Sequence, residues 1–150
     1  MRIVGVLGCA ALAGCGHHPK PGESVAEVCK VENNHKDVFV SGYLNPPVLM
    51  IGCEHSCMVE LVPKTSERYG LSLFFDVGTG PRTMAPVHAA TGGLPGEVEE
   101  LPADSLKLVS DDGKVVTPGD VVRIHGTVDV VDDSGTIQCS MHHPSSVVAL

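Results

Sequence analysis

The chain contains no tryptophan, and only 3% of its residues are aromatic. It is also short of positive charge, because 10 Lys and Arg stand against 18 Asp and Glu, which gives a formal net charge of −8. Single-stranded nucleic acid is bound by basic grooves and stacking aromatic side chains, and anionic membrane surfaces attract basic patches. We therefore expect no nucleic-acid partner and no electrostatic adsorption to a membrane.

Glycine and proline are frequent, with 17 and 11 residues among 150, and valine is abundant. This composition favours short strands joined by turns over long helices. The length suits a single domain with a core of its own. We expect one mainly β domain.

The N-terminal segment has the pattern of an export signal. Arg2 precedes an apolar run, 3–13, that is too short to span a bilayer comfortably. The run ends in Leu12-Ala13-Gly14-Cys15, which resembles the lipobox of bacterial lipoproteins. The resemblance implies cleavage before Cys15, a diacylglyceryl group on its thiol and a further acyl chain, such as palmitate, on its new amino group. Cys9 is a weaker alternative, since too little apolar sequence precedes it.

The lipobox divides the chain into three parts. Residues 1–14 are expected to be the signal peptide, 15–23 a lipidated flexible tether, and 24–150 the folded domain. The lipid on Cys15 would anchor the protein to a membrane of the cell envelope. Gly16 stands where enteric bacteria place the aspartate that retains lipoproteins in the inner membrane, so we expect the outer membrane, facing the periplasm or the cell surface.

Two similar segments organise the folded domain. Asp37–Leu44 and Asp120–Val130 each alternate apolar and polar residues, and each carries an internal glycine, Gly42 or Gly126. A glycine inside a strand marks a bulge or a sharp bend. Two bent strands predict a small closed barrel in which the two glycines form neighbouring corners.

The order of the other elements agrees with such a barrel, although residues 78–104 form a long, weakly patterned connection. The two glycine segments resemble the DxxVxVxGxL and GDxVxVxGxV strands of bacterial OB-fold periplasmic proteins. The resemblance implies a five-stranded OB-like Greek-key barrel preceded by one short helix. The expected elements are a helix at Ser24–Glu32, further strands at Cys57–Val62, Leu71–Val77 and Thr136–Met141 (Ile137, Cys139 and Met141 on one face), and a small hairpin of Leu106–Val109 with Lys114–Thr117.

Four cysteines remain once Cys9 and Cys15 are set aside. An even number in an exported chain predicts two disulfides, and four cysteines allow three pairings. Cys53–Cys57 with Cys29–Cys139 is favoured, because Cys53 and Cys57 flank a turn while Cys29 and Cys139 lie on apolar faces. The other two pairings stay open.

A metal site is the competing hypothesis for the same region. Cys53, His55, Cys57 and Met58 lie together in the sequence, and Met141, His142 and His143 could join them. Thiolate, thioether and imidazole groups suit Cu(I), and thiolate with imidazole suits Zn²⁺. The spacing matches no zinc motif that we know, and paired thiols in an oxidising compartment form disulfides, so we expect neither a metal nor another cofactor.

The sequence shows no nucleophile elbow, phosphate loop or zinc-protease helix, so we expect no enzyme. The leading hypothesis is a lipid-anchored binding or interaction module of the envelope, whose ligand is a protein, a peptide or a glycan. OB folds most often bind through the outer face of their second and third strands and adjacent loops. This rule nominates Met58, Glu60, Phe74 and the 78–104 loop. The alternatives are a periplasmic copper or zinc protein and a purely structural envelope component.

Overall fold

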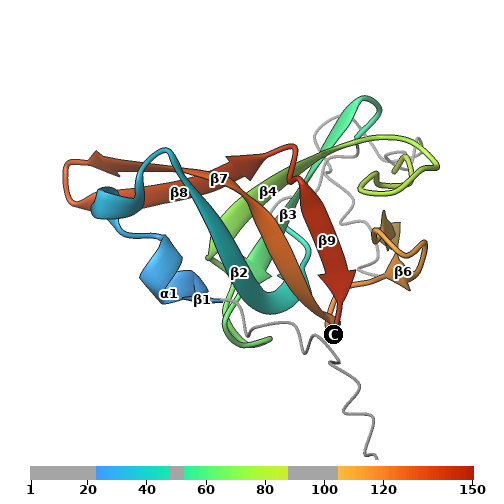
Figure 1. Ribbon diagram of the computed structural model, residues 1–150, viewed down its shortest axis with the longest axis horizontal. Helices are drawn as coiled ribbons and strands as arrows, with labels where there is room; N and C mark the ends of the chain where they lie inside the picture. Colours follow the sequence, from blue (N-terminus) through green and yellow to red (C-terminus); the bar gives the residue numbers. More distant parts are fainter. Residues whose placement is uncertain (1–22, 48–52, 88–104) are drawn as a thin grey trace, which may run out of the picture.

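The computed structural model describes residues 23–47, 53–87 and 105–150, and it is built mainly from β-strands (Figure 1). Among these residues, no helix has the length and apolar character needed to cross a membrane. The signal peptide and Cys15 lie outside the described residues. The elements are β1 (Glu23–Ser24), α1 (Val25–Val28), the 3-10 helix η1 (Val31–Asn33), β2 (Lys36–Asn45), β3 (Ser56–Val62), β4 (Leu71–Asp76), β5 (Leu108–Val109), β6 (Val115–Val116), β7 (Val121–Asp133), β8 (Thr136–His142) and β9 (Ser146–Ala149).

The main sheet has seven strands in the order β1-β2-β3-β4-β8-β7-β9, and β2 pairs with β7 as well. The pairings from β2 through β3, β4, β8 and β7 therefore return to β2. The mainly β class is confirmed, but a count of five strands is too low. The short edge strands β1 and β9 join the main sheet, and β5 and β6 form a separate small sheet as the expected hairpin.

Both internal glycines lie in the β2–β7 ladder, as expected for neighbouring corners. Gly42 pairs with Val122, and Gly126 pairs with Val38. A Cβ atom on Gly42 would lie 2.8 Å from the carbonyl oxygen of Val62 on β3, so β3 crosses close to this point. Directly after Gly42, Tyr43 pairs with both β7 and β3, and from Leu44 on β2 pairs with β3. The glycine thus allows the strand to change partners.

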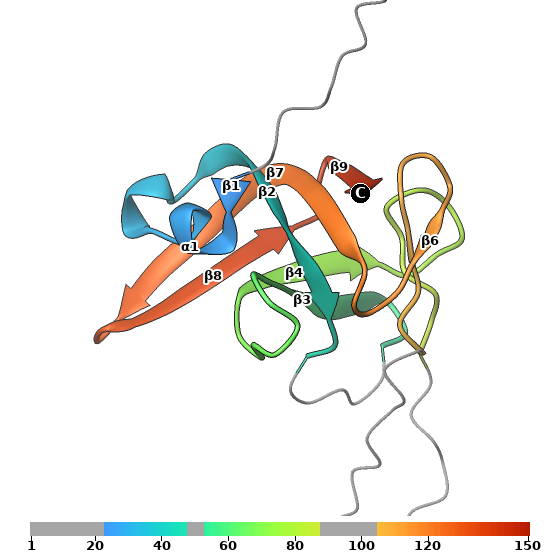
Figure 2. The same ribbon diagram turned by 90° about the horizontal axis from the view of Figure 1, so that it is seen from below.

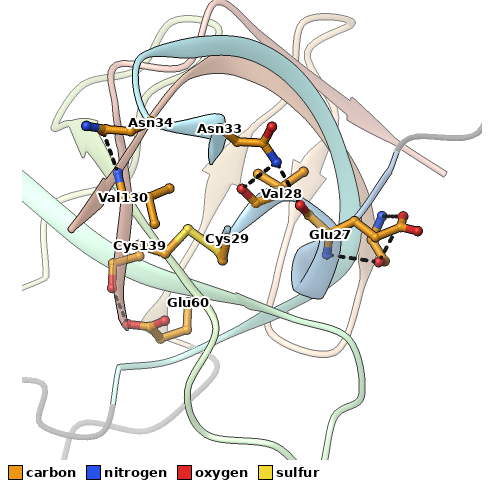
Figure 3. The surroundings of a disulfide bond; sticks show 10 residues. Glu27, Val28, Cys29, Asn33, Asn34, Glu60, Val130 and Cys139 are labelled. Carbon is orange, nitrogen blue, oxygen red and sulfur yellow. Dashed lines mark hydrogen bonds between the residues drawn. A yellow bond between two sulfur atoms is a disulfide. The ribbon is translucent and has the colours of Figure 1, made fainter. Parts of the chain in front are cut away.

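The first helix is shorter than the expected Ser24–Glu32. Ser24 and Glu27 do form a capping box, and Val25 and Val28 are buried. The helix ends at Val28 because the side chain of Asn33 folds back on it. The Asn33 amide donates to the carbonyl oxygens of Glu27, at 2.8 Å, and Val28, at 3.3 Å (Figure 3).

The apolar faces of the strands enclose one core. The predicted inward residues of β2 and β7 are buried, and so are Cys139 and Met141 on β8, whereas Ile137 on the same strand is 45% exposed. Ile137 pairs with Asp132, one pair before the turn of the β7–β8 hairpin. This hairpin projects beyond the rest of the sheet on the side that carries α1 and η1 (Figures 1 and 2). The opposite end of the molecule carries residues 78–87, in which Met84 bridges Val77 and Leu108.

Candidate functional site

The four cysteines of the folded domain form two disulfides in the favoured pairing. Cys29 joins Cys139 with a Cα–Cα distance of 5.5 Å, and Cys53 joins Cys57 at 5.1 Å. The first bridge ties α1 to β8 (Figure 3). The second closes the turn that leads into β3.

The disulfides occupy the thiols on which the copper or zinc hypothesis depends. Met141 is buried in the core, and the His142 ring stacks on Phe74 with ring centroids 4.3 Å apart. His143 lies 3.3 Å from the carboxylate of Asp76. Across residues 23–47, 53–87 and 105–150, no group of three or more His, Cys, Asp or Glu side chains is placed to hold a metal ion.

A groove opens where β4 and β8 separate. The two strands run parallel and pair only from Ser72–Ser140 to Phe74–His142. The first half of β8 continues past the start of β4, and among the described residues its only strand partner is β7. The resulting cavity has a volume of about 490 Å³ and is lined by Glu60, Tyr69, Gly70, Ser72, Phe74, Thr136, Ile137, Gln138, Cys139, Ser140 and His142.

Glu60 contributes a carboxyl group to this groove. Only 7% of the residue is exposed, and its side chain lies beside the Cys29–Cys139 bridge (Figure 3). Ser72 donates a hydrogen bond of 2.8 Å to the carboxylate. Burial raises the pKa of Glu60, and the hydrogen bonds from the Ser72 hydroxyl and the Gly70 backbone partly oppose that rise. The site therefore holds a carboxyl group that would gain from a further hydrogen-bond donor or a cation.

The rims of the groove are aromatic and apolar. The stacked rings of Phe74 and His142 lie at its closed end, where the two strands meet. Tyr69, at the end of the β3–β4 connection, is 77% exposed, and Ile137, on β8, is 45% exposed; both line the groove. The groove thus combines a buried carboxyl, neutral polar groups and exposed apolar surface, a mixture typical of ligand sites.

The predicted face and the observed groove overlap in part. Glu60 and Phe74 line the groove, whereas Met58 pairs with Phe74 on the sheet but is not part of the lining. Residues 78–87 pack near β5 instead, and the rest of the 78–104 loop lies outside the described residues. Sequence reasoning missed Tyr69 and the β8 residues, because nothing in the sequence indicates where β8 leaves β4.

A serine, a histidine and an aspartate meet at a second place. Ser145 Oγ lies 2.9 Å from Nδ1 of His125, and Nε2 of His125 lies 3.0 Å from the carboxylate of Asp37. The Ser145 N–H donates to the His125 carbonyl oxygen at 2.8 Å, and Oγ lies 3.2 Å from the same oxygen. The N–H and the hydroxyl of Ser145 thus both hold the turn between β8 and β9 against the His125 carbonyl on β7. The Ser145 N–H is therefore not available to stabilise an oxyanion. The three side chains link β2, β7 and the β8–β9 turn through contacts between their polar atoms.

No family model matches this chain, and no curated protein matches it. Among solved structures, OBody AM3L09 bound to hen egg-white lysozyme is similar with a TM-score of 0.47 and 16% identity, over 88% of this chain and 96% of that chain. OBody AM1L10 bound to hen egg-white lysozyme is similar with a TM-score of 0.44 and 15% identity, over 89% and 96%. At these scores the likenesses establish neither a family nor a function.

Proposed function

We propose that this protein is a lipid-anchored binding module of the bacterial cell envelope, in which an OB-like Greek-key barrel presents the β4–β8 groove to a ligand. The observation that carries the proposal is the groove itself, which combines Glu60, the Phe74–His142 stack and exposed apolar residues. The return of the strand pairings from β7 to β2 supports the barrel.

Two features support the location in the envelope. The Leu12-Ala13-Gly14-Cys15 sequence resembles a lipobox, and the two disulfides favour an oxidising compartment. The lipid on Cys15 would hold the domain at the membrane, with the outer membrane as the expected site. Metabolic labelling with a palmitate analogue tests this part, since labelling should disappear in Cys15→Ala.

Photo-crosslinking in cells tests the binding role. A diazirine amino acid replaces Thr136 at the groove in the full-length protein, and the control replaces Val115, an exposed residue on β6 away from the groove. We expect a light-dependent adduct from position 136 only, and we expect Phe74→Ala to reduce it. Equal adducts at both positions, or none at position 136, would reject the groove as the binding site.

A further inference from the structure

The direction of the backbone groups along β8 follows from its hairpin with β7. The hairpin turn has two residues, Ser134 and Gly135, both with positive φ, so Asp133 and Thr136 exchange both of their backbone hydrogen bonds. Strand geometry alternates, and Gln138 therefore also points its N–H and C=O toward β7. Ile137 and Cys139 point theirs the other way, toward the groove.

The residues of β8 that point away from β7 bond to β4, but only over the second half of the strand. The N–H of His143 donates to the carbonyl oxygen of Phe74 at 3.0 Å, so odd-numbered residues of this segment face β4. The parallel ladder begins at Ser72–Ser140 and does not extend to the preceding residues. Within the described residues, the N–H and C=O of Ile137 and the N–H of Cys139 therefore have no hydrogen-bond partner.

We infer that the groove, if it is the binding site proposed above, takes an extended peptide segment bearing a basic side chain, which adds as a strand to the free edge of β8 at Ile137–Cys139. Strand addition to an exposed edge is a general mode of peptide recognition, in which the backbone provides affinity and alternate side chains provide specificity. The peptide backbone would bond to Ile137, and its basic side chain would reach Glu60.

Charge complementarity favours a basic segment. The described residues that line the groove include the Glu60 carboxyl and no Lys or Arg. The exposed residues Asp132 and Asp133 stand at the tip of the hairpin that carries the edge, and the whole chain has a net charge of −8. The other titratable groups that face the groove are His142, on β8, and Tyr69, on the β3–β4 connection.

The probe is a blocked hexapeptide of alternating Thr and Val with one Lys, added to the detergent-solubilised full-length protein while amide hydrogen exchange is measured. We expect saturable slowing at Ile137 and Cys139. N-methylation of the peptide amides that would face the edge should weaken binding about tenfold, the effect of one lost hydrogen bond. Replacing Lys by Glu should weaken it about tenfold for the unmodified protein, and this Lys preference should shrink in Glu60→Gln.

A pair of proline variants tests the edge from the protein side. Ile137→Pro removes an N–H that makes no ladder bond, so the fold should persist while the peptide no longer binds. Gln138→Pro removes a bond to β7 and should destabilise the hairpin. Ile137→Val is the matched control and should bind as the parent does.

Three outcomes would overturn the inference. The first is binding that the N-methylated peptide reproduces at equal strength. The second is slowing at Ile137 that depends on protein concentration without peptide, which would assign the edge to a second copy. The third is a groove that binds envelope glycan fragments, with crosslinking at position 136, while no peptide slows Ile137 exchange. This last outcome rejects the peptide and leaves the binding module standing, whereas loss of all groove binding rejects both.

Discussion

β7 pairs with β2 and β8 pairs with β4, and only the first of these two ladders is continuous. On one side, β7 pairs with β2 without interruption from Lys36–Val128 to Tyr43–Val121. On the other, β8 pairs with β4 only from Ser72–Ser140 to Phe74–His142 and then separates from it. The complete ladder contains the glycine corners and holds the fold together. The incomplete one leaves a groove and a free strand edge, so the same sheet provides both the scaffold and the site.

The largest expected effect concerns the covalent bond at the incomplete junction. Cys29 and Cys139 are 110 residues apart, and Cys53 and Cys57 only 4. In the chain-entropy model, removing the first bridge costs about 5 kcal/mol of unfolding free energy and removing the second about 2 kcal/mol. Urea unfolding of the Cys29→Ala/Cys139→Ala and Cys53→Ala/Cys57→Ala variants measures both. Equal losses would contradict the larger contribution expected of the long bridge from its loop length.

The next effect tests the complete ladder. Gly42→Ala would place a methyl group 2.8 Å from the Val62 carbonyl oxygen, a backbone atom that cannot move away without shifting β3. We expect a loss of about 2 kcal/mol, in the range for overpacked cores. Gly80→Ala is the control, because no described residue has an atom within 4 Å of its added Cβ and its φ is not positive. Similar unfolding midpoints for the two variants would contradict a tight crossing at Gly42.

The smallest effect concerns Glu60 and has the opposite sign. Burial raises the pKa of this carboxyl above its ordinary 4.5, so the folded state holds a proton that the unfolded state releases. The stability of the parent protein should therefore fall as the pH rises from 4.5 through the folded-state pKa. Glu60→Gln lacks this fall and should be the more stable protein at neutral pH, with the advantage absent in acid. Urea unfolding across this range checks it, and a constant difference between the two proteins would contradict it.

The scaffold could be predicted from the sequence because its signals are local. Alternation around Gly42 and Gly126 identified the two central strands and their inward faces, and Ser24 with Glu27 identified the start of α1. Apolar placement of Cys29 and Cys139 was enough to favour the correct disulfides. The end of α1 was missed, because it depends on a side-chain contact from Asn33.

The groove could be predicted only in part. Glu60 and Phe74 were nominated from the general behaviour of such barrels, and both line it. Tyr69 and Ile137 were not, because their role depends on the register of a parallel pair, and Ser72–Ser140 are distant in the sequence. Ile137 follows the apolar alternation of β8, but it is 45% exposed because this end of the strand lies beyond the pairing with β4.

Amide hydrogen exchange along β8 in the ligand-free protein tests the central contrast most directly. We expect exchange rates to alternate along this one strand. Gln138 and Ser140 should exchange slowly because their N–H groups bond to β7. The N–H of Ile137 points away from β7 and should exchange much faster. The amides of β2 and β7 that face each other should be as slow as the slowest in the protein. Equal protection of Ile137 and Gln138 would show that the edge is covered and that the incomplete junction does not exist in solution.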